Sequence, residues 1–68
     1  MKGWHKLYIT RNYPEASIIK GMLEENSIEV VVFNKLDSSY LNFGDIEIYV
    51  PSHLKDIAAN LMQKSLLN

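Results

Sequence analysis

Hydrophobic and polar residues recur with two different periods along this chain, and together they predict five secondary-structure elements. Residues 4–10 (WHKLYIT) are rich in aromatic and β-branched side chains, as strands are, and residues 45–50 (DIEIYV) alternate cleanly between apolar and polar positions. Residues 28–34 (IEVVVFN) form an apolar run of strand length. Residues 14–25 repeat apolar positions every three or four residues, and so does the segment after Ser52, which predicts two helices. The predicted order is therefore βαββα.

Single residues indicate where these helices begin and what they bury. Pro14 suits the first helical position, where its missing N–H costs nothing, and Glu15 suits the positive helix end. Pro51 stops the last strand, and Ser52 is expected to cap the second helix. Gly21 lies in the middle of the first helix, and we expect close packing on the sheet as its reason. The side chains predicted to face the core are Ala16, Ile19, Met22 and Leu23, followed by Leu54, Ile57, Ala58, Leu61 and Met62.

The order of the elements predicts a split βαβ arrangement. The third strand inserts between the first two and is antiparallel to both, which gives a three-stranded sheet of order 1-3-2 with both helices on one face. The expected fold is α+β, a truncated ferredoxin-like fold without its last strand, formed by residues 1–68 as a single domain. A domain of this size buries only about 60% of its surface on folding. Because the sequence has no cysteine, disulfides cannot supplement the core, and we expect an oligomer to do so.

The sheet face opposite the helices is predicted to be open and rich in aromatic side chains. The residues assigned to it, and to an oligomer interface, are Trp4, Tyr8, Val31, Phe33 and Tyr49. Contiguous exposed apolar patches usually mark interaction surfaces, so we interpret this face as a site of self-association or of a protein partner. Two alternatives remain open. Either the aromatic side chains only cover one another, or they stack the bases of a single-stranded nucleic acid.

Charge and reactive residues narrow the class of protein further. Seven Lys and Arg against eight Asp and Glu give a net charge of −1, which does not favour a polyanion-binding arm. The longest apolar run, residues 30–33, is far too short to span a membrane, and a cytoplasmic protein is expected. His5 and His53 have no clustered ligands around them, and no nucleophile has an evident base. The sequence therefore predicts a protein without catalysis, metal or cofactor.

Three segments resemble a known family. They are residues 14–24 (PEASIIKGMLE), residues 34–40 (NKLDSSY) and residues 44–51 (GDIEIYVP), of which the last two form the most specific part. They are similar to a family of short prokaryotic proteins of unknown function, described as "putative signal-transducing proteins". The resemblance covers nearly the whole chain and implies a GlnB-like ferredoxin fold, related in shape to nitrogen-regulatory PII proteins, with a signalling role. PII proteins have a fourth strand and a longer loop, so their nucleotide binding and trimerisation are not carried over.

Two positions depart from the pattern of this family. Tyr13 stands where such sequences often have Asp before the proline, so we expect a side-chain cap to be lost there. Asn26 and Ser27 replace the usual Asn-Gly turn, so one of the two must adopt a left-handed backbone conformation.

The segment 34–44 (NKLDSSYLNFG), between the second and third strands, is the candidate binding site. The residues assigned to it are Asn34, Lys35, Asp37, Ser38, Ser39 and Tyr40, with Glu47 beside them. In this hypothesis Lys35 and the serine hydroxyls contact an anionic or polar ligand, and Tyr40 supplies an aromatic wall. Alternatively, these residues only shape the turn, as Asp and Ser commonly do. The expected function is a small regulatory or interaction module that binds an effector or a protein partner at this hairpin and associates through the open sheet face.

Overall fold

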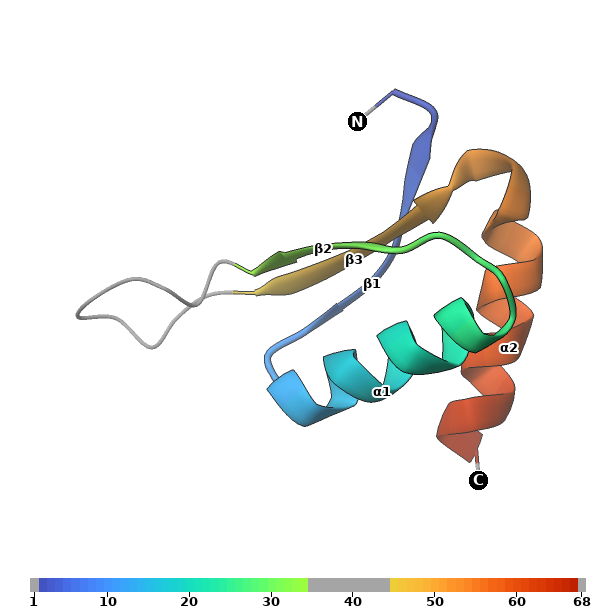
Figure 1. Cartoon of the computed structure of the whole chain (residues 1–68). Coiled ribbons are helices and arrows are strands. Elements are labelled where there is room, and N and C mark those ends of the chain that lie inside the picture. The colour runs from blue at the N-terminus through green and yellow to red at the C-terminus, as the bar shows by residue number, and fades with distance from the viewer. Residues whose placement is uncertain (1, 35–44, 68) are drawn as a thin grey trace.

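The order of secondary-structure elements is the predicted one (Figure 1). The computed structural model describes residues 2–34 and 45–67. Its elements are β1 (Trp4–Thr10), α1 (Tyr13–Glu25), β2 (Val31–Asn34), β3 (Ile46–Pro51), the short 3-10 helix η1 (Ser52–Leu54) and α2 (Lys55–Leu67). The three strands form one antiparallel sheet of order β1-β3-β2, which confirms the α+β fold and its topology. Both helices lie on the same side of this sheet (Figure 1).

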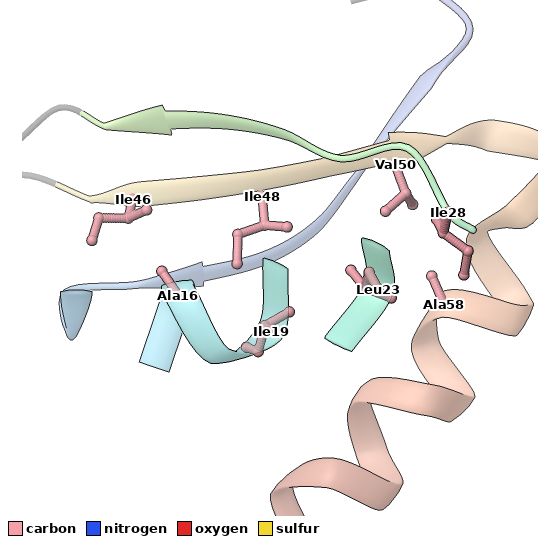
Figure 2. Packing of buried hydrophobic residues seen from close by; sticks show 8 residues of the cluster. All are labelled: Ala16, Ile19, Leu23, Ile28, Ile46, Ile48, Val50 and Ala58. Atoms are coloured by element: carbon pink, nitrogen blue, oxygen red, sulfur yellow. The ribbon is translucent and has the colours of Figure 1, made fainter. Parts of the chain in front are cut away.

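The hydrophobic core lies between the central strand β3 and the two helices (Figure 2). Side chains from β3 point toward the helices and are fully buried; they are those of Ile46, Ile48 and Val50. The predicted α1 residues Ala16, Ile19 and Leu23 pack against them, and α2 adds Ala58. Ile28, predicted to start the second strand, lies before β2 and is also part of this core.

Two predictions about the second helix are wrong. Ile57 was expected to face the core but is 54% exposed, because it lies about 100° around the helix from the buried Ala58. Ser52 was expected to provide a side-chain cap. It begins η1 instead, where no side chain caps the turn, and its backbone N–H donates to the Gly3 carbonyl at 2.9 Å. This bond ties the end of β3 to the residue before β1.

A β-bulge in β1 reverses the faces predicted for the second half of this strand. Lys6 lies opposite Tyr49, but the register then shifts and Tyr8 lies opposite Ile48. Since Ile48 is buried toward the helices, Tyr8 shares that face, and Ile9 turns to the open face with 46% exposure. The prediction that Tyr8 lies on the open face is therefore wrong. Leu7 is the extra residue of the bulge. It packs against the core beside Tyr8, so both hydrophobic side chains are partly buried there.

The start of α1 has a side-chain cap, contrary to the expectation drawn from Tyr13. The Asn12 side chain accepts a hydrogen bond of 2.9 Å from the Glu15 backbone N–H. The Asn12 N–H donates to the Thr10 hydroxyl at 3.0 Å, and that hydroxyl donates to the Glu15 carboxylate at 2.7 Å. Asn12, one residue before Tyr13, therefore provides the cap, and Thr10 closes the network between β1 and α1.

Candidate functional site

A pocket of about 390 Å³ opens on the helix side of the molecule, between α1 and β2. Its lining comes from three elements: Tyr13, Ala16, Ser17 and Lys20 of α1, Val32 and Asn34 of β2, and Ile46 of β3.

This pocket follows from the way α1 is seated on the sheet. Its buried stripe, which includes Ala16 and Ile19, is packed in the core with the central strand β3. The edge strand β2 lies beside β3, outside the contact between α1 and β3. Of its helix-side residues, Val32 is only half-buried and Asn34 is exposed. The side of α1 next to its buried stripe therefore faces the edge strand across an unfilled space.

The pocket combines an apolar floor with a polar rim. Ala16 and Ile46 are buried beneath it. Ser17 and Asn34 bring a hydroxyl and an amide, and Tyr13, which is 59% exposed, brings an aromatic ring. Such a lining suits a ligand with one apolar and one polar part.

Lys20 is the one charged residue among the described lining residues. Its ammonium group lies 3.2 Å from the Glu24 carboxylate, one turn further along α1, and both side chains are about half-exposed. Exposed pairs of this kind contribute only about 0.3–0.5 kcal/mol. An anionic ligand can therefore replace Glu24 as the partner of Lys20 at a small cost in free energy.

The structure divides the residues predicted for the binding site. Asn34 lies in the pocket. Glu47 lies on the opposite face of the sheet, because its partners in the neighbouring strands are Ile9 and Phe33, whereas Asn34 pairs with Ile46 on the helix side. The other predicted residues, Lys35, Asp37, Ser38, Ser39 and Tyr40, lie outside the described residues. Asn34 and Glu47 therefore do not share one site.

Sequence reasoning did not identify the α1 side of the pocket. Tyr13, Ser17 and Lys20 recur at helical spacing next to the apolar stripe, so they share one side of the helix. That spacing was available in the sequence. What the sequence did not reveal is that β2 lies at the edge beside this side of the helix and leaves it uncovered.

The open sheet face carries aromatic residues around a carboxylate. The rings of Phe33 and Tyr49 meet edge to face, with centroids 5.4 Å apart. Glu47 lies among them on the central strand and is only 8% exposed. Its carboxylate lies 3.4 Å from the Lys6 ammonium group and accepts a hydrogen bond of 3.1 Å from the Tyr49 hydroxyl. Of the predicted interface residues, Trp4, Val31, Phe33 and Tyr49 belong to this face by their strand register, and Tyr8 does not.

Within residues 2–34 and 45–67, no group of three or more His, Asp or Glu side chains is placed to hold a metal ion. No helix in these two segments combines the length and the apolar character that crossing a membrane requires.

A small α+β protein with an open sheet and a pocket beside its edge strand is the class that these features define. A family model described as "Putative prokaryotic signal transducing protein" matches residues 4–65, and the chain belongs to this family. The match confirms the resemblance noted in the sequence, and the description of the family suggests a signal-transducing role. No curated protein and no solved structure matches the chain.

Proposed function

We propose that this protein is a non-catalytic regulatory module that binds an anionic effector or partner group in the pocket between α1 and β2. The observation that carries the proposal is the pocket itself, which has about 390 Å³ of space and Lys20 on its rim. Ligand sites commonly measure about 300–1,000 Å³ and combine apolar walls with a few polar groups. The family description as a signal-transducing protein supports a binding role rather than a chemical one.

The second part of the proposal is association of two copies through the open sheet face. Phe33 is 43% exposed there and Ile9 46%, which is unusual for large apolar side chains on a solvated sheet. The charges of Lys6 and Glu47 are paired with each other on this face. A copy of the same face therefore meets no excess of like charge when two molecules pack around a two-fold axis.

The same geometry makes the face a poor platform for nucleic acid, the alternative considered from the sequence. Tyr8, one of the aromatic residues expected on this face, lies on the helix side. The Glu47 carboxylate lies in the middle of the face and would repel a phosphate backbone. We therefore favour a protein surface over a nucleic-acid surface.

A thermal-shift panel of nucleotides, carboxylated metabolites and phosphorylated metabolites tests the pocket. A ligand that binds only the folded state at about 100 times its Kd stabilises the protein by about 2.7 kcal/mol, so an effector raises the Tm clearly. The Lys20→Gln variant should show a smaller shift at the same ligand concentration. Lys55→Gln, which removes an exposed lysine at the start of α2, should keep it. The absence of any shift at millimolar ligand would overturn effector binding.

A further inference from the structure

The pocket lies alongside the outer edge of a strand, and this identifies the kind of partner it fits. β2 is the last strand of the sheet, paired with β3 on one side and with no other strand on its second side among the described residues. α1 forms the far wall of the pocket through Tyr13, Ser17 and Lys20. A strand edge next to a helix, with a groove between them, is the arrangement in which extended peptides add to a sheet.

We propose that an extended peptide with an acidic side chain adds to β2 as a fourth strand and places alternate side chains in the groove beside α1. This names the partner class of the pocket and so rests on the function proposed above. Backbone hydrogen bonds to an edge strand provide affinity, and the groove selects the side chains that enter it.

The direction of the groove follows from the strand register. Thr10, Ile46 and Asn34 form one row across the sheet, and α1 begins at Tyr13, just beyond Thr10. The helix then runs back along the sheet toward the start of β2. Tyr13 therefore lies toward the Asn34 end of the groove, and Lys20 lies toward the Val31 end.

This direction sets the chemistry of the peptide. Every second side chain of an added strand enters the groove, and two such side chains lie about 7 Å apart. One of them meets the apolar floor formed by Ala16, Val32 and Ile46, and the other reaches the ammonium group of Lys20. The predicted peptide carries an aliphatic residue and an Asp or Glu two positions apart. The aliphatic residue comes first if the added strand is antiparallel to β2, and second if it is parallel.

The charge of the groove explains why one of the two side chains that enter it is acidic. Among the described lining residues Lys20 is the charged one, and its present partner is Glu24 at 3.2 Å. A carboxylate on the peptide competes with Glu24 for the same ammonium group. Neutralising Glu24 therefore strengthens binding of an acidic peptide, which no purely structural role of Glu24 would do.

Selection from a random library of linear peptides displayed on phage tests the proposal. Immobilised wild-type protein selects the peptides, and Lys20→Glu protein depletes those that bind elsewhere. Enriched sequences are expected to place Asp or Glu two residues from Val, Ile or Leu. Against the enriched peptides, Lys20→Gln should weaken binding about twofold, the size of an exposed ion pair. Glu24→Gln should tighten it by a similar factor, whereas Glu25→Gln, an equal change of charge on the neighbouring residue, should leave it unchanged.

Two measurements separate strand addition from other ways of filling the pocket. In an added strand, only every second peptide residue donates its backbone N–H to β2. N-methylation of these residues should abolish binding, and N-methylation of the residues between them should preserve it. Backbone amides of β2 should become protected from hydrogen exchange when the peptide is bound. Strand addition would be overturned if N-methylation of the two alternate sets of residues had equal effects. It would also be overturned if the β2 amides stayed unprotected, or if Glu24→Gln bound the peptide with unchanged affinity.

The outcome also distinguishes this inference from the function on which it rests. If the library yields no binder but a small anion shifts the Tm through Lys20, strand addition is wrong and the effector pocket stands. If neither peptides nor small anions bind, both fail.

Discussion

Ser27 is the residue at which the sequence requires an unfavourable backbone conformation. Its φ angle is 62°, in the left-handed region that glycine adopts without steric cost. The Ser27 N–H donates to the Glu24 carbonyl and the Ile28 N–H to the Leu23 carbonyl, both at 3.0 Å. These two bonds form a Schellman motif, and Ile28 and Leu23 both lie in the core. The motif forces the conformation on Ser27, as one of the two alternatives at Asn26 and Ser27 anticipated.

The Ser27→Gly substitution should raise the free energy of unfolding by about 0.5–1 kcal/mol, because glycine removes the strain of the left-handed conformation. Urea denaturation measures the change. Ser17→Gly, the same substitution inside α1, should lower the free energy of unfolding by about 0.5 kcal/mol. A loss of stability in Ser27→Gly would show that the Ser27 side chain matters more than its backbone conformation.

Gly21 is the opposite case to Ser27, because it is a glycine at a position where the structure does not require one. Close packing on the sheet was expected to explain it, but a Cβ placed on Gly21 would meet nothing within 4 Å, so that explanation is wrong. Because the residue lies inside α1, Gly21→Ala should raise the free energy of unfolding by up to about 1 kcal/mol in the same urea experiment. An unchanged or lower stability would contradict the geometry of the open space around it.

At the scale of the elements, the junction between β1 and α1 explains both what the sequence predicted and what it missed. The aromatic and β-branched residues of 4–10 predicted a strand, and β1 spans Trp4–Thr10. Alternation alone does not reveal the bulge at Leu7, because no glycine marks it. Downstream of the bulge every side chain changes face, which brings Tyr8 and Thr10 next to Glu15 at the start of α1. The sequence thus predicted the elements, and the contacts between them decided the faces.

The contact between Tyr8 and Glu15 should be visible in the titration of the tyrosine. Burial first, and then the charge of Glu15 and its hydrogen bond, raise the pKa of the Tyr8 hydroxyl above its ordinary value of about 10. Glu15→Gln should bring the pKa of Tyr8 back toward that value, because two of the three causes are removed. NMR titration of the Tyr8 ring measures it, with Glu25→Gln as the control. A Tyr8 pKa that does not respond to Glu15→Gln would contradict the contact.

The raised pKa also has a consequence for stability at high pH. Since the pKa of Tyr8 is higher in the folded than in the unfolded protein, the neutral hydroxyl stabilises the fold below pH of about 10. This contribution is lost as the pH rises through the folded pKa. Tyr8→Phe removes the contribution, so its unfolding free energy should depend less on pH in that range.

At the scale of the whole molecule, the sheet separates two surfaces with different roles. The helix side carries the pocket between α1 and β2, and the other side carries the aromatic face around Glu47. The open face was predictable from the topology, because two helices on one side leave the other side uncovered. The pocket was not, since it depends on how α1 is seated beside the edge strand β2. Asn34 and Glu47 lie on the two neighbouring strands β2 and β3. Because side chains alternate between the faces of a sheet, they nevertheless lie on opposite surfaces.

Association through the open face should depend on Phe33. Sedimentation velocity is expected to show a concentration-dependent dimer of the wild type, which Phe33→Asp abolishes by burying a charge in the interface. Ile18→Asp changes a side chain that is 64% exposed on α1, and it should leave the dimer intact. A strictly monomeric wild type, or equal effects of the two substitutions, would contradict self-association through this face.

The central claim is that binding takes place in the pocket beside β2. Backbone amide chemical shifts, followed by NMR while the strongest ligand of the thermal-shift panel or an enriched peptide is added, test it most directly. The account predicts the largest changes at Ser17, Lys20, Val32 and Asn34, the residues that line the pocket. Changes centred instead on Ile9, Phe33 and Tyr49 of the open face would contradict it.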